Sequence, residues 1–391
     1  MPWKVSAVLD QRIRFVLDYQ TGLHTMAELC RQYQISRQTG YETMKRYQGE
    51  GAQGLQERSR APLRHPHQTP ADIEARVVNL RRQRPSWGPR KLRAYLAQQD
   101  AATAWPAPST IGALVQREGL AIPRRKRRRA PPYTQPLAHA EQPNQVWCAD
   151  FKGWFTTADG DRIDPLTISD AHSRYLLRCQ AVEHANTEQV RAIFEASFRE
   201  YGMPLAIRTD NGTPFASRAI AGLSRLSLYW MKLGIVPERI QAGHPEQNGR
   251  HERMHLTLKQ ETASPPAANR RQQQLAFDCF RRQYNQERPH EALEQKTPAS
   301  CYQFSPREYP ARVPEPEYGD SMQVRRVQGH GQISWKHHDV FLSEVLIGEY
   351  VGFEPIDERY WCVYFADFAI ALFDSHRLQI QSLPEDRQDE S

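Results

Sequence analysis

The sequence predicts a multidomain protein with N-terminal all-α helix-turn-helix units, a central α/β mixed sheet and a C-terminal small all-β barrel. Two helical patterns precede a basic run, strands alternate with helices in the middle, and short strands recur near the end. The predicted domains are two helix-turn-helix domains at 1–54 and 70–122, a basic Pro-rich linker at 123–143, the α/β domain at 144–302 and the barrel at 320–376.

Charge is unevenly distributed along the 391 residues. The whole chain has 52 Lys+Arg against 45 Asp+Glu, a net charge of +7. Residues 1–140 contain 24 basic and 10 acidic residues, a balance of +14, whereas residues 141–391 contain 28 and 35, a balance of −7. The first third is therefore predicted to bind a polyanion.

Several classes of protein are excluded by composition. No apolar run approaches the roughly 20 residues of a membrane span. No apolar signal core follows the first residues, so a secretory signal is not expected. The six cysteines are scattered and form no C-x-x-C pair, which argues against a disulfide scaffold or a cysteine zinc site. We expect a cytoplasmic protein.

The first helical unit contains the pattern of a DNA-reading motif. Helices are predicted at 25–33 and 36–47, separated by a two-residue turn, with Ser36 as the N-cap of the second. In a helix-turn-helix the second helix enters the major groove; the alternative is a generic helical hairpin. The side chains predicted to meet bases or phosphates are Arg37, Gln38, Thr39, Tyr41, Thr43 and Lys45.

A second helical unit follows between about 70 and 120. Its first helical pattern is broken at 85–89, and helices restart at 90–98 and 109–118. Arg90 and Lys91 are predicted to contact DNA. The next segment is a run of six cations, which is typical of an arm that binds phosphates without sequence preference: Arg124, Arg125, Lys126, Arg127, Arg128 and Arg129.

From residue 145 the pattern changes to strands followed by alternating helices and strands. Strands are predicted at 146–155, 161–170, 174–182, 205–209 and 235–240, and helices at 187–201, 219–233, 249–261 and 272–285. After a Pro-rich linker at 303–319, strand patterns at 322–328, 333–342, 350–355 and 359–373 predict the small barrel.

Three acidic residues lie where carboxylates are unexpected. Asp150 interrupts an apolar strand, Asp210 ends a short strand, and Glu252 lies in the first turn of a helix. Each alone is most simply a turn or capping residue. Three converging carboxylates repel one another unless cations neutralise them, and hard oxygen ligands suit Mg²⁺ or Mn²⁺. Two such ions catalyse phosphoryl transfer in many enzymes.

The motifs around these acids carry a family resemblance. W-x-x-D-F at 147–151, R-T-D-N-G-x-x-F at 208–215 and G-H-P-E-Q-N-G-R-H-E-R at 243–253 resemble the catalytic core of bacterial insertion-sequence DDE transposases and retroviral integrases. Tyr284-Asn285 followed by Arg288-Pro289-His290 matches the same core. The likeness covers about 140–300, and R-P-S-W-G-P-R-K-L at 84–92 extends it toward the N-terminus.

The resemblance implies an RNase H-like fold for the central domain and a metal-dependent polynucleotidyl transferase. Such a transposase binds the inverted repeats at element ends, cleaves DNA with two divalent ions and joins the 3′-hydroxyl ends to target DNA. It also implies double-stranded DNA as partner, a homo-oligomer of at least two chains, and a place on the bacterial nucleoid. The implied catalytic metal ligands are Asp150, Asp210 and one glutamate.

The family motif selects Glu252, three residues after the glycine at 249, over Glu246, which lies in the preceding loop. Glu246 remains a possible assistant to Glu252. His255 and Lys259 share a helix face with Glu252 and are predicted to meet the DNA backbone. The predicted supporting residues are Asn211 and Gly212 in the turn after Asp210, and Asn248 and Gly249 in the loop before the helix.

Two other functions remain open from the sequence. Residues 251–255 spell H-E-x-x-H, which on a helix is the arrangement of zinc metalloproteases. That reading leaves Asp150, Asp210 and the basic arm unexplained. The other alternative is a catalytically silent DNA-binding regulator related to transposases, which would be expected to have lost one of its acids. All three acids are present here.

Overall fold

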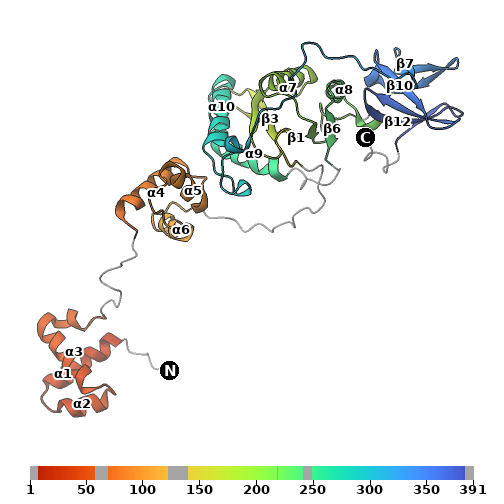
Figure 1. Cartoon of the computed structure of the whole chain (residues 1–391). Coiled ribbons are helices and arrows are strands. Elements are labelled where there is room, and N and C mark those ends of the chain that lie inside the picture. The colour runs from red at the N-terminus through yellow and green to blue at the C-terminus, as the bar shows by residue number, and fades with distance from the viewer. Residues whose placement is uncertain (1–7, 58–68, 122–139, 218, 241–248, 384–391) are drawn as a thin grey trace. The chain divides into compact units, whose positions relative to one another are not determined.

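A computed structural model describes residues 8–57, 69–121, 140–217, 219–240 and 249–383 of the chain. The chain divides into two compact units, Met1–Thr69 and Pro70–Ser391, and each is described by itself (Figure 1). Across these described ranges, no helix has the length and apolar character needed to cross a membrane.

The first unit is a small helical bundle with short turns. It contains α1 (Val8–Gln20), α2 (Met26–Gln32) and α3 (Arg37–Glu50). Thr25 and Glu28 form a capping box at the start of α2, and the Ser36 hydroxyl accepts a hydrogen bond from the backbone of Thr39 at the start of α3. The two caps flank a turn of the kind that the sequence predicted, and the helix-turn-helix prediction is confirmed.

The apolar side chains of this bundle meet in one core, and Gly40 decides how closely α3 lies on α2. A Cβ at Gly40 would come within 2.7 Å of the Cys30 sulfur and 2.9 Å of the Met26 sulfur, so only glycine permits this approach. The core itself is formed by Phe15, Val16, Met26, Leu29, Cys30, Met44 and Leu55. The bundle therefore has enough buried apolar surface to position α3.

The second unit begins with another group of helices. These are α4 (Ala71–Gln83), α5 (Pro89–Gln99) and α6 (Pro108–Arg117). The break between α4 and α5 lies where the proline-containing segment predicted it, and Pro89 occupies the first turn of α5, where its missing N–H costs nothing. Arg81 is buried and donates to the backbone oxygens of Trp87 and Leu120, which closes the group.

The central sheet is mixed, as predicted, and its order is β2–β3–β1–β5–β6 with β4 paired to β3. β3 pairs antiparallel with β1, β2 and β4, whereas β1–β5 and β5–β6 are parallel pairs. The strands are β1 (Val146–Phe151), β2 (Phe155–Thr156), β3 (Arg162–Asp170), β4 (Leu176–Val182), β5 (Ala206–Thr209) and β6 (Val236–Arg239).

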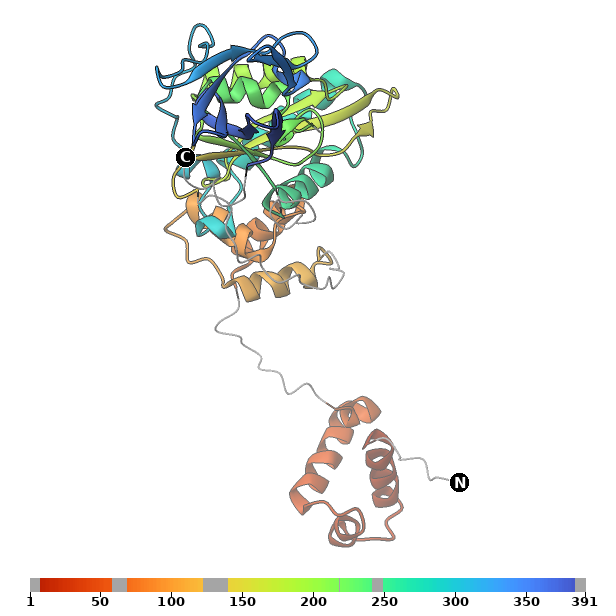
Figure 2. The same ribbon diagram turned by 90° about the vertical axis from the view of Figure 1, so that its right-hand side faces the viewer.

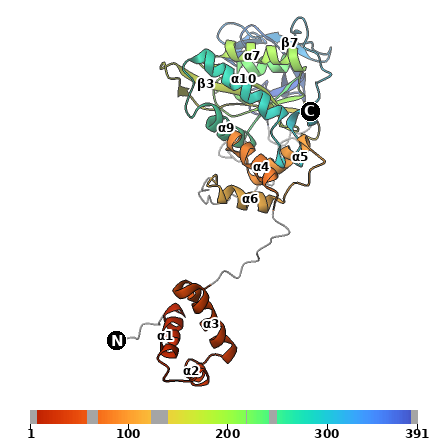
Figure 3. The same cartoon turned by 90° about the vertical axis from the view of Figure 1, so that its left-hand side faces the viewer.

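Two pairs of helices cover the two faces of this sheet (Figures 1 and 3). α7 (Thr187–Tyr201) and α8 (Arg225–Lys232) lie on one face, and α9 (Gly249–Thr262) and α10 (Arg270–Gln286) lie on the other. The α7/α8 face holds the larger core, which includes Trp147, Ala149, Leu166, Ile168, Phe194, Phe198, Ile207 and Trp230.

One central helix is shorter than predicted. The sequence suggested a helix over 219–233, but α8 begins at Arg225. Ser224 and Ser227 form a capping box that starts the helix there, and Gly222, with φ of +65°, ends a separate turn just before it. Two serines and a glycine therefore outweigh the apolar periodicity that extended the prediction.

The C-terminal region is a sheet region rather than the closed barrel that was predicted. An antiparallel sheet has the order β13–β12–β11–β10–β7, and β8 and β9 form a separate hairpin. Within the described strands, β7 and β13 are edges that do not pair with each other, so no closed sheet forms. The strands are β7 (Gln323–Arg326), β8 (Gln332–Trp335), β9 (His338–Phe341), β10 (Tyr350–Pro355), β11 (Tyr360–Phe365), β12 (Phe368–Asp374) and β13 (Gln379–Gln381).

Two predicted long strands are in fact hairpins. The pattern at 333–342 turns at Lys336 and His337, which both have positive φ, and the pattern at 359–373 turns at Ala366, with φ of 49°. Glycine usually marks turns with this backbone, and neither turn contains one. Each hairpin was therefore predicted from the sequence as one continuous strand. The hairpin β8–β9 packs on the sheet through Trp335, whose ring meets Phe353 and Phe373.

Candidate functional site

Asp150 and Asp210 come at the carboxyl ends of two adjacent parallel strands. β1 pairs with β5 so that Cys148 is opposite Arg208, and each aspartate follows two residues later on its own chain. Because side chains alternate along a strand, both carboxylates belong to the sheet face opposite Trp147 and Ile207, which is the face covered by α9 and α10. Both aspartates are half-buried.

The turn after Asp210 is shaped around its carboxylate. The Gly212 backbone N–H donates to Asp210 Oδ1 at 3.1 Å, and the Asn211 side-chain amide donates to the Ile240 carbonyl at 2.9 Å, beyond the end of β6. A Cβ at Gly212 would lie 3.0 Å from Asp210 Oδ2 and 3.3 Å from Oδ1. Gly212 therefore holds the Asp210 carboxylate and leaves room for it, and Asn211 ties the same turn to the end of β6.

Beside Asp150, one hydroxyl connects the sheet to α9. Thr167 on β3 is the register partner of Asp150, and its Oγ1 donates to the Asp150 carbonyl at 3.1 Å. The same oxygen lies 2.9 Å from His251 Nε2 and 2.7 Å from His255 Nε2. One hydroxyl therefore joins both imidazoles of α9 to the sheet.

The two imidazoles are structural, buried and neutral. Burial lowers the pKa of His251 to about 4 and that of His255 to about 2. His255 Nδ1 faces Asp150 Oδ2 at 3.9 Å, which is too long for a hydrogen bond. In the H-E-x-x-H segment both Nε2 atoms are therefore within hydrogen-bond distance of a threonine hydroxyl. Nothing in this arrangement supports the zinc protease alternative.

α9 also carries Glu252 and Lys259, and both side chains are exposed. The expectation that His255 shares this exposed face is wrong, because His255 turns toward Thr167 and is 7% exposed. The i, i+4 pair His251 and His255 is buried against the sheet, and so Glu252, one residue after His251, lies at the border of that buried stripe. Gly249 is the first residue of α9, whereas Glu246 and Asn248 lie outside the described residues.

The donor set at this face suits a hard cation only in part. Asp150 and Asp210 supply carboxylate oxygens from adjacent strands, which is the ligand type that Mg²⁺ and Mn²⁺ prefer. Glu252 is the third carboxylate on the same side of the sheet, but it points to solvent. No group of three His, Cys, Asp or Glu that could hold a metal is present among the residues that the structure describes.

Sequence reasoning missed Thr167, and also the ion pair beneath Asp210. Arg208 on β5 binds Glu238 on β6, with Nε and Nη2 at 2.9 and 2.7 Å from Oε2, and both side chains are nearly buried. This pair anchors the strand that ends at Asp210. Arg208 opens the motif at 208–215, but no spacing in the sequence links it to Glu238, because the two residues lie on different strands and meet only through sheet register.

The residues of α3 that were predicted to contact DNA are mostly available to solvent. Gln38 donates to Glu42 at 3.2 Å along the helix. Thr43 is the exception, because it is buried and its hydroxyl donates to the Thr39 carbonyl. The exposed set consists of Arg37, Gln38, Thr39, Tyr41 and Lys45.

The residues of the second helical group that were predicted to contact DNA lie against other residues of the chain. Arg90 forms an ion pair with Glu291. Lys91 is largely buried, and burial together with the positive charge of Arg288 lowers its pKa to about 8. The run Arg124–Arg129 lies outside the described residues.

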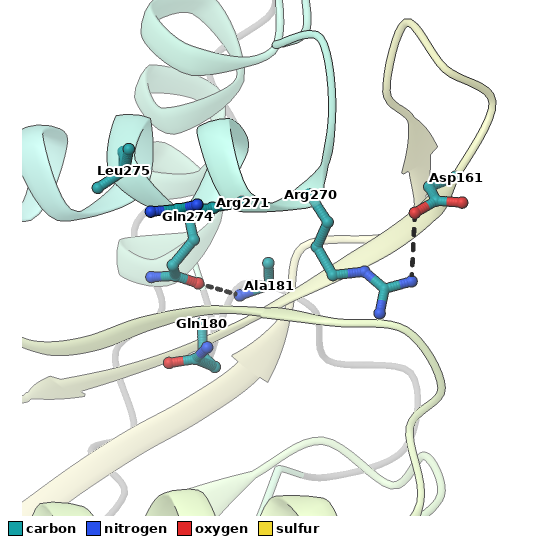
Figure 4. A pocket seen from close by; sticks show the side chains of 7 residues that line it. All are labelled: Asp161, Gln180, Ala181, Arg270, Arg271, Gln274 and Leu275. Carbon is teal, nitrogen blue, oxygen red and sulfur yellow. Dashed lines mark hydrogen bonds and ion pairs between the residues drawn. The ribbon is translucent and has the colours of Figure 1, made fainter.

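A shallow groove of about 510 Å³ opens at the start of α10, on the same side of the sheet (Figure 4). Arg270 spans it and pairs with Asp161 and Glu183. None of the three candidate carboxylates is among its lining residues, which are Asp161, Gln180, Ala181, Arg270, Arg271, Gln274 and Leu275.

Comparison with known sequence families identifies three regions. Profiles described as Integrase core domain match residues 140–245 and 233–298. A profile described as Helix-turn-helix domain matches residues 11–62, and one described as Homeodomain-like domain matches residues 39–115.

Two curated relatives come from bacterial insertion elements. Over 249 residues the chain is 31% identical to the Insertion element IS476 uncharacterized 39.2 kDa protein of Xanthomonas euvesicatoria, spanning 62% of this chain and 68% of that relative. Over 232 residues it is 28% identical to the Insertion element IS407 uncharacterized 31.7 kDa protein of Burkholderia multivorans, spanning 58% of this chain and 79% of that relative.

Solved structures similar to this one are retroviral. The HTLV-2 integrase catalytic core domain in complex with magnesium aligns with 42% of this chain and all of its own, at 16% identity and a TM-score of 0.34. The simian T-cell lymphotropic virus intasome in complex with PP2A regulatory subunit B56 gamma aligns with 79% of this chain and all of its own, at 15% identity and a TM-score of 0.37.

Proposed function

Because the chain belongs to the family of insertion-element proteins that contain an integrase core domain, we propose that it is a DDE transposase. It binds the inverted repeats at the ends of its element, cleaves a DNA phosphodiester bond there and joins the freed 3′-hydroxyl to target DNA on the bacterial nucleoid, in the cytoplasm. The observation that carries this proposal is that Asp150 and Asp210 each follow the register pair Cys148–Arg208 by two residues, on adjacent parallel strands.

Asp150, Asp210 and Glu252 are the proposed ligands of two Mg²⁺ or Mn²⁺ ions. Bound there, such ions would supply a Lewis acid and an activated water or 3′-hydroxyl for phosphoryl transfer. The protein's own contribution is to hold the carboxylates in place. Thr167 fixes the Asp150 backbone against α9, and Gly212 orients the Asp210 carboxylate.

Glu252 completes the set in this proposal by approaching from the solvent side of α9. Its exposure leaves it free to turn toward the two aspartates when a cation offsets their repulsion. Lys259, one further heptad along the same exposed side, is proposed to contact a DNA phosphate near the cleaved bond.

DNA binding is assigned to α3 and to the basic segment. Arg37, Gln38 and Tyr41 are exposed near the start of α3, the end of a recognition helix that reads base edges. Lys45 and the cations of Arg124–Arg129 would neutralise phosphates. Joining two element ends requires at least two chains on the DNA, so the active form is proposed to be a homo-oligomer of two or more.

The decisive experiment uses the full-length protein, Mg²⁺ and a duplex carrying the repeat found beside the gene. Wild-type protein is expected to nick the element end and join it to a second duplex. Asp150→Asn and Asp210→Asn should each lower both rates by more than about 100-fold, the upper range for groups that merely orient metal ligands, with DNA binding retained. Asp161→Asn, in the groove at α10, is the matched control and should remain active.

The same assay separates the two glutamates and the two functions. Glu252→Gln should be as damaging as the aspartate variants, and Glu246→Gln should retain most activity; the reverse result would transfer the third position to Glu246. Wild-type protein that binds the repeat but neither cleaves nor joins it would overturn the transposase proposal in favour of a silent regulator.

The DNA assignment has its own test. Arg37→Ala and Lys45→Ala should each reduce affinity for the repeat, and a phosphate contact should reduce the salt slope of binding by about one unit. Arg312→Ala, an exposed cation in the linker before the C-terminal sheet, is the control and should leave both quantities unchanged.

A further inference from the structure

Two sequence motifs that the proposed function does not use lie against each other in the second unit (Figure 2). The first is the segment 84–92, between α4 and α5, and the second is the segment 283–291, at the end of α10. Arg84 forms an ion pair with Glu287 and donates to Gln283 at 3.1 Å, while Arg90 pairs with Glu291. The segments are about 200 residues apart in sequence, and we call this contact the joint.

The joint also includes the C-terminal end of α9. The Ser86 hydroxyl donates to Glu261 Oε1 at 2.6 Å, and Arg288 Nη1 donates to the same oxygen at 2.8 Å. Glu261 thereby ties α9 to the segment after α4 and to the segment after α10 at once. Arg288 is 8% exposed, and its ion pair with Glu261 offsets the cost of burying its guanidinium charge.

Two ion pairs of the same polarity cross the joint. Arg84 and Arg90 on the α4–α5 side meet Glu287 and Glu291 on the core side, whereas Lys91 lies near both Glu261 and the cation Arg288. The guanidinium of Arg84 also lies over the Trp87 ring at 5.6 Å. In a surface that reads DNA the cations meet phosphates, whereas Arg84 and Arg90 here meet carboxylates of the same chain.

The geometry of α9 gives the joint a consequence at the candidate site. Glu261 follows Glu252 by nine residues, which is about 13.5 Å along the axis and two and a half turns, so the two carboxylates lie on opposite sides of the helix. The middle of α9 is held by His251 and His255 on Thr167. Its far end is held by Glu261. Together these two attachments determine the tilt of the helix, and therefore where Glu252 can reach.

We propose that the segment Arg84–Lys91 is a positioning element, which docks the second helical group on the core and holds the end of α9 through Ser86 and Glu261, so that Glu252 is presented to the two aspartates. The effect on catalysis rests on the transposase function proposed above. The second helical group then acts through α9 rather than by reading bases, and Arg84, Arg90 and Lys91 are positioning residues.

A charge swap in the full-length protein tests the joint. Arg84→Glu and Glu287→Arg alone should each raise the hydrogen-exchange rate of the α9 backbone about tenfold and lower cleavage by a similar factor, and the double variant should restore both to within about twofold. Glu261→Gln should loosen α9 without changing the salt slope of DNA binding. Arg93→Glu, at an exposed position on α5 beyond the joint, is the matched control and should change neither readout.

The outcomes separate the joint from the proposed function. Hydrogen exchange in α9 that is unchanged by Arg84→Glu and Glu261→Gln would overturn the proposal, whatever the activity. Loss of DNA affinity with a reduced salt slope in Arg84→Glu, not rescued by Glu287→Arg, would also overturn it and make Arg84 a phosphate contact. If wild-type protein has no cleavage activity, loosening of α9 with rescue still supports the joint, and only the transposase proposal fails.

Discussion

The two faces of the central sheet differ in what their side chains do, although the same strands supply both. On one face, Trp147, Ala149 and Ile207 pack with α7 and α8 into a continuous apolar core. On the other, the residues that alternate with them include Asp150 and Asp210, and Thr167 on the neighbouring strand binds two histidines of α9. One face contributes burial energy, and the other holds polar groups whose desolvation must be offset one hydrogen bond at a time.

The difference between the two faces explains how the sheet can hold a group of carboxylates and still be stable. Adjacent carboxylates cost free energy through repulsion and burial, and the α7/α8 face offsets this cost without involving any of the site residues. The polar face is then free to be specific rather than strongly stabilising. Four substitutions test this division.

The largest expected effect is on the apolar face. Trp147→Ala removes a fully buried ring that packs on Phe198 and should lower the free energy of unfolding by about 3–5 kcal/mol, measured by chemical denaturation. Trp154→Ala is the control. Its ring is 59% exposed and only stacks with Arg162, so it should cost about 1 kcal/mol or less. Equal losses in the two variants would break the comparison.

Thr167→Val should be the next largest. The variant keeps the shape but removes the hydroxyl that is the hydrogen-bond partner of two buried imidazole nitrogens. It should cost about 3 kcal/mol, since each buried polar group left without a partner costs about 1–3 kcal/mol. Faster hydrogen exchange in α9 should accompany the loss. Thr156→Val, at an exposed position on β2, should be neutral, and a neutral Thr167→Val would show that the hydroxyl does not hold α9.

The polar face should also make stability depend on pH. Burial, with the nearby cations Lys91, Arg288 and Arg174, lowers the pKa of His290 to about 3, and its ring contacts Tyr284. The unfolded chain binds this proton near pH 6.5 and the folded chain near pH 3, so the stabilisation is complete above about pH 6.5 and is lost as pH falls. Between pH 7 and pH 5 the contribution of His290 to this loss should be about 2 kcal/mol.

His290→Gln should remove the His290 part of the slope from a series of unfolding curves, because glutamine does not titrate. The part that comes from His251 and His255, whose pKa values burial also lowers, should remain. His184→Gln, whose side chain is 75% exposed, should leave the slope as it is in the wild type. A slope in His290→Gln equal to that of the wild type would show that His290 takes up no proton on unfolding.

The smallest expected effect is at the Asp210 turn. In Gly212→Ala the new methyl group would lie 3.0 Å from Asp210 Oδ2, so the carboxylate must shift by a few tenths of an ångström. We expect about a tenfold loss of DNA cleavage, equivalent to about 1.4 kcal/mol, with little change in the unfolding midpoint. Gly153→Ala is less suitable as a control because of its φ of +87°, whereas Gly112→Ala on α6 has space and should leave cleavage unchanged.

Much of the fold was predictable because its signals are local. The N-caps Ser36 and Thr25, the proline break before α5 and the alternation around Asp150 each depend on a few neighbouring residues. Predictions failed where a local signal was weak or misleading. The turn at Lys336 contains no glycine. The apolar pattern also began about six residues before Arg225, where the Ser224 cap starts the helix, so the predicted helix was too long.

The candidate site divides in the same way. The sequence by itself determined which carboxylates stand at strand ends and which residues cap the helices, because these properties depend on spacing along one segment. Only the tertiary structure decided that Thr167 binds both histidines, that His255 is buried while Glu252 is exposed, and that Arg84 and Lys91 face the core. Those facts depend on strand register and on contacts between segments up to about 200 residues apart, and no local pattern encodes such a pairing.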